Sequence, residues 1–329
     1  MKRREFITLL GGAVVALPNA ARAQDGTRIR RIGILVNFPP DDEEAQARIR
    51  AFAQELQTRG WIEGKNLRTE IRWAGERAER YHEYAKELVA LAPDVILASG
   101  SPSVAALQLV SHDMPIIFAN VIDPVGAGFV ASLARPGGNT TGFTAFEYNI
   151  SSKWLELLKE LTPDLKWVAV VRDPLTASGI GQFAAIQMAS SSSALELTAI
   201  DPRDPVVIKR AFAAFARENN GWVIVTASTA TAVYRDLLVS LAQQYRLPAV
   251  YPFRYFTTNG GLASYGPETI NGYVSAAAYV DRVLKGEKAA DLPVQAPNKY
   301  ELLINLRTAK AMGLKLPPTL LTRADEVIE

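Results

Sequence analysis

Short apolar runs rich in β-branched residues alternate with amphipathic helical patterns, and this alternation constrains the fold more than any other feature. The run at 31–36 (RIGILV) is followed by a helical pattern at 43–60, in which apolar side chains recur every three to four residues. The runs at 67–73 (LRTEIRW) and 94–99 (DVILAS) are again followed by helical patterns. Apolar strands separated by helices predict a doubly wound α/β fold with a parallel sheet.

The same pattern restarts after Phe143. Residues 151–161 (SSKWLELLKEL) predict a helix, residues 166–171 (KWVAVV) predict a strand, and a strand pattern recurs at 247–253 (LPAVYPF). A second doubly wound, Rossmann-like lobe of similar size is therefore expected, with a ligand cleft between the two. A helix is also expected at 126–134 (GAGFVASLA), near the end of the first lobe.

The restart places the lobe boundaries. Lobe 1 is expected over residues 24–143, completed by about 266–295, and lobe 2 over residues 144–265. Residues 296–329 return toward one of the lobes, and the sequence leaves open which one.

Residues 1–23 have the layout of an export signal. A basic start precedes an apolar centre, which is far shorter than the roughly 20 residues that a bilayer requires, and Ala21-Arg22-Ala23 forms a small-x-small cleavage motif. Arg3 and Arg4 also fit the twin-arginine pattern, although an ordinary secretory signal remains an alternative. No cysteine stands at the cleavage point, so we predict a soluble periplasmic protein without a lipid anchor.

Charge and cysteine content exclude several classes of function. The net charge of +2 becomes −1 once the signal, with its net charge of +3, is removed, so a basic surface for nucleic acid is not supported. The chain has no cysteine, which rules out disulfides, thiolate metal sites and a cysteine nucleophile. With two scattered histidines, His82 and His112, we expect neither a metal nor a cofactor.

Catalytic motifs are also missing. GWIEGKN (60–66) has three residues between its glycines instead of four and lacks the Ser or Thr of a phosphate-binding P-loop. No G-x-G-x-x-G motif opens the first strand-helix unit, and no G-x-S-x-G motif is present. An enzyme on the same fold stays as the weaker alternative to a binding protein.

Long segments of the chain resemble the substrate-binding proteins of ABC transporters, in particular the group that includes receptors for tryptophan and other aromatic amino acids. They include RRIGILV, LVALAPDVILASGSPSVAAL, PIIFANVIDPVGAGFVASLARPGGNTTGF and LLINLRTAKAMGLKLPPTLLTRADEVIE. The resemblance implies a type I periplasmic-binding-protein fold, which closes on a small solute and delivers it to a membrane permease. A receptor that feeds a sensor kinase would have the same lobes and remains an alternative.

Ligands of open α/β sheets bind at the carboxyl ends of the strands, so the residues that follow each predicted strand are the candidates. In lobe 1 they are Asn37, Phe38, Ser99, Gly100, Ser101, Ser103, Asn120, Asp123 and Pro124. In lobe 2 they are Arg172, Ser178, Thr226, Ser228, Tyr251, Phe253, Arg254 and Tyr265.

The types of these residues suggest the ligand's chemistry. Hydroxyl-rich segments at 99–103 and 226–231 precede predicted helices, whose free backbone N–H groups favour a carboxylate. Phe38, Tyr251, Phe253 and Tyr265 are candidates for flat apolar walls, and Asp123 for the partner of an amine. We therefore expect a monomer that binds an amino acid or an aromatic acid, with a sugar as the neutral alternative.

Overall fold

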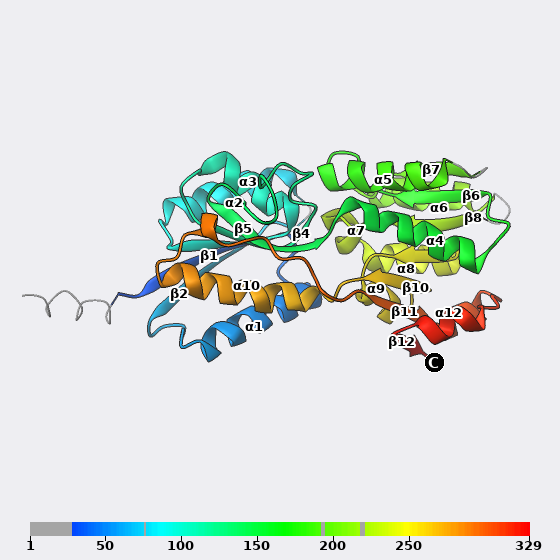
Figure 1. Ribbon diagram of the computed structural model, residues 1–329. Coiled ribbons are helices and arrows are strands. Elements are labelled where there is room, and N and C mark those ends of the chain that lie inside the picture. The colour runs from blue at the N-terminus through cyan, green and yellow to red at the C-terminus, as the bar shows by residue number, and fades with distance from the viewer. Residues whose placement is uncertain (1–27, 76, 192–194, 218–220) are drawn as a thin grey trace, which may run out of the picture.

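The computed structural model describes residues 28–75, 77–191, 195–217 and 221–329, which form two α/β lobes (Figure 1). The predicted signal segment lies outside the described residues. Lobe 1 contains a five-stranded parallel sheet in the order β2-β1-β3-β4-β5. Its elements are β1 (Arg30–Val36), α1 (Glu43–Thr58), β2 (Leu67–Trp73), α2 (Ala78–Ala90), β3 (Val95–Ser99), α3 (Gly100–Val110), β4 (Ile116–Ile122), β5 (Thr140–Phe146), α10 (Thr269–Leu284) and η2 (Ala289–Asp291).

Lobe 2 contains a seven-stranded sheet in the order β12-β11-β10-β9-β8-β6-β7, in which only the β10–β11 pair is antiparallel among the described strands. Its elements are η1 (Tyr148–Ile150), α4 (Ser151–Leu161), β6 (Trp167–Val171), α5 (Ala177–Ser190), β7 (Glu196–Ile200), α6 (Pro205–Phe215), β8 (Gly221–Val225), α7 (Thr229–Val233), α8 (Arg235–Gln244), β9 (Ala249–Tyr251), α9 (Arg254–Thr258), β10 (Ala263–Gly266), β11 (Glu301–Asn305), α11 (Leu306–Ala311), α12 (Pro318–Arg323) and β12 (Glu326–Ile328). The predicted pair of α/β lobes is confirmed.

The central strand β3 is buried along its whole length, and β1 over its last five residues, because helices cover both faces of the sheet (Figure 1). Ile34 and Leu97 belong to the core cluster that also contains the apolar side chains of α1 and α10. Their chain neighbours Leu35 and Ile96 point to the opposite face, where they join side chains of α2 and α3. None of the helices in the described ranges is long and apolar enough to cross a membrane.

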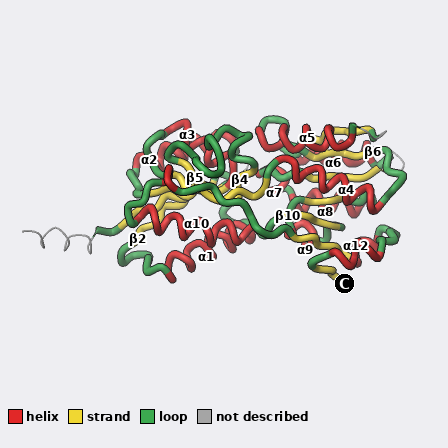
Figure 2. Tube along the Cα trace, in the orientation of Figure 1, coloured by secondary structure: helices red, strands yellow, loops and turns green. Residues whose placement is uncertain are grey.

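The chain passes between the lobes three times, after β5, after β10 and before β11 (Figure 2). The third crossing runs beside β5, where the backbone N–H of Gln295 donates to the carbonyl of Gly142 at 2.9 Å. It then enters lobe 2, where β11 and β12 form the end of the sheet. Residues 301–328, whose lobe the sequence left open, therefore extend lobe 2.

The expected helix at 126–134 is wrong, because this segment is a series of turns. Gly128 has a φ of +77°, which a right-handed helix cannot accommodate. The Asp123 carboxylate accepts a hydrogen bond from the backbone N–H of Gly126 at 2.7 Å, and the N–H of Phe129 donates to the carbonyl of Pro124 at 2.8 Å. These local bonds satisfy the backbone without a helix.

Candidate ligand-binding site

A cavity lies between the lobes at the carboxyl ends of strands from both sheets. Its space is about 560 Å³, including the part open to solvent. Lobe 1 supplies Asn37, Phe38, Arg48, Ser99, Gly100, Ser101, Pro102, Asn120, Ile122, Thr269 and Tyr273. Lobe 2 supplies Thr176, Ser178, Ala227, Ser228, Thr229, Ala232, Phe253 and Tyr255.

Arg48 is the one charged side chain among the described residues that line the cavity. It lies on the buried face of α1 and is only 3% exposed. Its guanidinium carbon lies 5.0 Å from the ring centre of Phe38 and 5.5 Å from that of Tyr255. The Nη2 atom is 3.5 Å from a Glu44 carboxylate oxygen, whereas Nε has no hydrogen-bond partner within the described part of the chain. A buried guanidinium group with a free donor is suited to an acceptor on a ligand.

A buried polar cluster forms the lobe 1 wall. The Ser99 hydroxyl donates to Asn37 Oδ1 at 2.5 Å and also bonds to the hydroxyl of Tyr273, which reaches it from α10. Burial raises the pKa of Tyr273, so its phenol stays protonated at neutral pH. Gly100 allows this approach, because a Cβ atom there would lie 2.6 Å from Asn37 Nδ2 and its φ is +73°.

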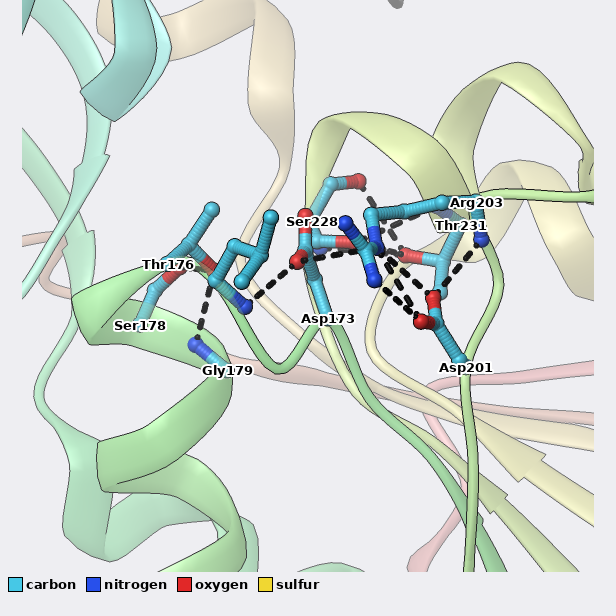
Figure 3. Close-up of polar contacts among 9 residues, drawn as sticks. Asp173, Thr176, Ser178, Gly179, Asp201, Arg203, Ser228 and Thr231 are labelled. Carbon is cyan, nitrogen blue, oxygen red and sulfur yellow. Dashed lines mark hydrogen bonds and ion pairs between the residues drawn. The ribbon is translucent and has the colours of Figure 1, made fainter.

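The lobe 2 wall consists largely of helix starts (Figure 3). At α5, the Thr176 hydroxyl accepts from the N–H of Gly179 at 3.1 Å, and the Ser178 hydroxyl donates to Thr176 at 3.2 Å. At α7, the Ser228 hydroxyl accepts from the N–H of Thr231 at 3.1 Å. These caps leave the hydroxyls and the remaining N–H groups of both helix starts beside the cavity.

The acidic groups next to this wall are already paired (Figure 3). Asp201 bonds to the Arg203 guanidinium group at 2.5 Å, and this hydrogen bond lowers the pKa of the carboxyl. Asp173 accepts from the N–H of Leu175 at 2.9 Å, and its Oδ1 lies 4.0 Å from Arg203 Nε. Neither aspartate lines the cavity.

Polar contacts join the lobes across the cleft. Asn37 Nδ2 donates to the Thr229 hydroxyl at 3.0 Å, and Arg235 Nη1 lies 2.5 Å from Asp42 Oδ2. Both members of the ion pair are largely buried, with side-chain exposures of 13% for Arg235 and 4% for Asp42. The lobes are therefore in a closed arrangement.

Replacing Asp42 by asparagine is expected to shift the ligand-free protein toward open conformations. Asparagine keeps a side-chain oxygen to accept from the N–H of Ala45 at the start of α1, but it loses the charge that pairs with Arg235. Losing one charged hydrogen bond weakens the closed state by about 1.5–3 kcal/mol. Small-angle scattering should show a larger radius of gyration, whereas Asp41→Asn on the exposed neighbour should not change it. Equal radii for both variants would show that the pair does not hold the lobes together.

About half of the predicted ligand-binding residues line the cavity. They are Asn37, Phe38, Ser99, Gly100, Ser101, Asn120, Ser178, Ser228 and Phe253. Each lies within two residues of a strand end or starts a helix at the cleft, as the rule for open α/β sheets predicts. Their contact with a ligand remains a prediction.

Three predicted residues are instead packed inside a lobe. Tyr251 is 1% exposed and stacks on Phe256 with ring centres 4.9 Å apart, so it belongs to the core of lobe 2. The Thr226 hydroxyl is buried and donates to the carbonyl of Val171 at 2.9 Å. Ser103 is fully buried within α3.

Three more predicted residues do not line the cavity, because their side chains pack or pair with other side chains of the protein. Arg172 packs over the Phe183 ring with its guanidinium carbon 4.8 Å from the ring centre. Arg254 pairs with Glu301 at 3.0 Å and Glu326 at 2.9 Å. Tyr265 stacks on Tyr300 with ring centres 5.8 Å apart.

The last two are Asp123 and Pro124, in the turns after β4. The Asp123 carboxylate bonds to the N–H of Gly126, and neither residue lines the cavity. An amine bound in the cavity would therefore not meet Asp123, contrary to the prediction.

Sequence reasoning missed several lining residues, of which Arg48 is the most informative. It occurs in the helical stripe that includes Ile49 and Phe52, where a charged residue is unexpected. A charged residue in an apolar stripe could therefore have indicated a functional side chain. Tyr273 and Thr269 gave no such signal, because the expected return of residues 266–295 to lobe 1 did not show which side chains of α10 would meet the cavity.

Two α/β lobes, joined by three crossings and closed over a small cavity, define a solute-binding protein of the type I periplasmic-binding-protein architecture. The model of the ABC transporter substrate-binding protein family matches residues 35–328. The chain belongs to this family, whose members bind solutes and are not enzymes.

Among curated proteins, the chain is similar to the tyrosine-binding protein of Clostridioides difficile (strain R20291). The two are 25% identical over 299 residues, which cover 90% of this chain and 85% of that protein.

Solved structures share the fold. A conserved domain protein from Vibrio cholerae has a TM-score of 0.84 at 24% identity, with 91% of this chain and 100% of that chain covered. An ABC domain in complex with L-Trp from Streptococcus pneumonia has a TM-score of 0.82 at 23% identity and coverages of 91% and 99%. A ligand-free, open substrate-binding protein from Clostridium difficile has a lower TM-score of 0.65 at 22% identity, with the same coverages.

Proposed function

We propose that this protein is the periplasmic receptor of an ABC importer and that it captures a small organic carboxylate between its lobes. The observation that carries the proposal is Arg48, a buried cation that lines the cavity and whose Nε donor has no hydrogen-bond partner in the described chain. A guanidinium group matches the geometry of a carboxylate and can bind it with two hydrogen bonds.

The rest of the cavity supports this ligand class. The starts of α3 and α5 line the cavity, and helix starts favour negative charge. Phe38, Phe253 and Tyr255 supply aromatic surface for an apolar body. The tyrosine and L-Trp named for two relatives both carry a carboxylate on an aromatic body.

Export and delivery follow from other parts of the chain. The layout of residues 1–23 supports export to the periplasm. The family supports a partner permease in the inner membrane. The crossings are short segments between the two lobes. They support opening and closing of the lobes about a hinge.

A binding protein should carry one solute per chain and release it unchanged. Native mass spectrometry of freshly purified protein, followed by denaturation, should identify a carboxylate of unaltered mass. Adding that compound back should raise the melting temperature by mass action and should not increase the radius of gyration. Chemical turnover of the solute by the purified protein, or a retained solute without an acidic group, would contradict the proposal.

A further inference from the structure

We infer that the cavity selects carboxylates that lack an α-amino group, so the solute is an organic acid with an apolar or aromatic body and not an amino acid. This inference rests on the proposed function and narrows it. It follows from the charges and hydrogen bonds around the cavity, which offer a charged partner for a carboxylate but no charged partner for an ammonium group.

No aspartate or glutamate occurs among the described residues that line the cavity. The acidic residues nearest to Arg48 are already engaged. Asp42 pairs with Arg235 and accepts from the N–H of Ala45, and Glu44 pairs with Arg48 itself. An ammonium group in the cavity would have to compete with these cations for a carboxylate.

Several neutral oxygens of the lining already accept a hydrogen bond. Asn37 Oδ1 accepts from Ser99. The carbonyl of Thr269 accepts from Asn120 Nδ2 at 2.8 Å. The hydroxyls of Thr176 and Ser228 accept from backbone N–H groups at their helix starts. The lining therefore offers an ammonium group only neutral acceptors, whereas it offers a carboxylate the charged guanidinium group of Arg48.

An ammonium group would also be disfavoured by its surroundings. It would lose its hydration on closure, and a buried charge without a partner is costly. It would lie in one small cavity with the Arg48 guanidinium group and beside the positive ends of α3 and α5, which repel a cation. A carboxylate without the amino group avoids these penalties and keeps the favourable contacts.

The test compares acids that differ only in the α-amino group. Titration calorimetry would use 3-phenylpropionate against L-phenylalanine, 3-(4-hydroxyphenyl)propionate against L-tyrosine, indole-3-propionate against L-tryptophan, and 4-methylpentanoate against L-leucine. The acid recovered from the purified protein would form a further pair, in which it is compared with the compound that differs from it only in the α-amino group. We expect the des-amino acid of the best-binding pair to bind at least about tenfold more tightly.

Two unfavourable outcomes are distinguishable. An amino acid that binds as tightly as its des-amino partner would overturn this inference and leave the proposed function intact. Binding of none of these carboxylates, including the recovered solute, would remove the proposed function and the inference together.

A pair of variants tests the physical cause. Ser101 lines the cavity in the first turn of α3, where an added carboxylate is compatible with the helix. Ser101→Asp should shift the preference toward the amino acid by about tenfold or more, relative to the uncharged Ser101→Asn. The same preference in both variants would show that the missing counter-charge does not determine selectivity.

Discussion

Arg48→Gln is expected to weaken binding of the carboxylate about 30-fold to several-thousand-fold. Removing one partner of a buried, hydrogen-bonded charge pair costs about 2–5 kcal/mol, and each 1.4 kcal/mol corresponds to a factor of about ten. Arg48 is 3% exposed, and no other charged side chain lines the cavity among the described residues. No second cation in the lining can therefore replace it. Calorimetry with the solute recovered from the purified protein measures the change.

Two further variants separate charge from geometry. Arg48→Lys keeps the charge but loses the planar pair of donors, so it should bind with intermediate affinity. Arg50→Gln on the exposed side of the same helix should bind like the unaltered protein. If Arg48→Gln binds as tightly as Arg50→Gln, the carboxylate does not contact Arg48.

Trp154→Ala is expected to reduce the free energy of unfolding by about 3–5 kcal/mol, the usual loss when a buried aromatic side chain is truncated. Trp154 is fully buried on α4. Its ring packs edge-on against Phe146 with centres 5.7 Å apart, and its Nε1 donates to the carbonyl of Tyr265 at 2.8 Å. Phe146 and Tyr265 lie just before two of the crossings between the lobes. Truncating Trp154 therefore removes packing where the chain leaves one lobe for the other.

Urea unfolding followed by circular dichroism measures this effect. Trp154→Phe keeps most of the aromatic packing and loses the hydrogen bond, so it should cost about 1–3 kcal/mol. Lys153→Ala on the exposed neighbour should leave the unfolding curve nearly unchanged, since its ion pair with Glu156 lies at the surface. Unfolding curves that coincide for Trp154→Ala and Lys153→Ala would refute the structural role of this tryptophan.

The local hydrophobic pattern predicted secondary structure reliably for strands that are buried on both faces of a sheet and for amphipathic helices. Continuous apolar runs became parallel strands, and the amphipathic stripe of α1 became a helix packed on the sheet. The segment 126–134 misled because its apolar residues have helical spacing, while Gly128 adopts a left-handed conformation that the spacing does not reveal. Side-chain bonds from Asp123 then favoured turns.

Residues at strand ends were harder to assign because a strand end faces both the cavity and the core. Tyr251 ends β9 and points into the core, whereas Phe253, two residues later, lines the cavity. The chain bends between them at Pro252, so the regular alternation of a strand no longer applies. Which aromatic residue meets a ligand therefore depends on the direction in which the chain leaves the sheet.

The sequence by itself determined the two α/β lobes, the likeness to a solute-receptor family and the edge of each sheet where the cavity lies, because these depend on local periodicity and on chain order. Only the tertiary structure decided the chemistry of the cavity. It placed Tyr273 on Ser99 across 174 residues of chain, and Asp42 against Arg235 across 193. It also turned Arg48 toward the cavity between two aromatic rings. Such contacts join segments that have no common local pattern, so they arise only when the crossings return α10 to lobe 1 and bring the two lobes together.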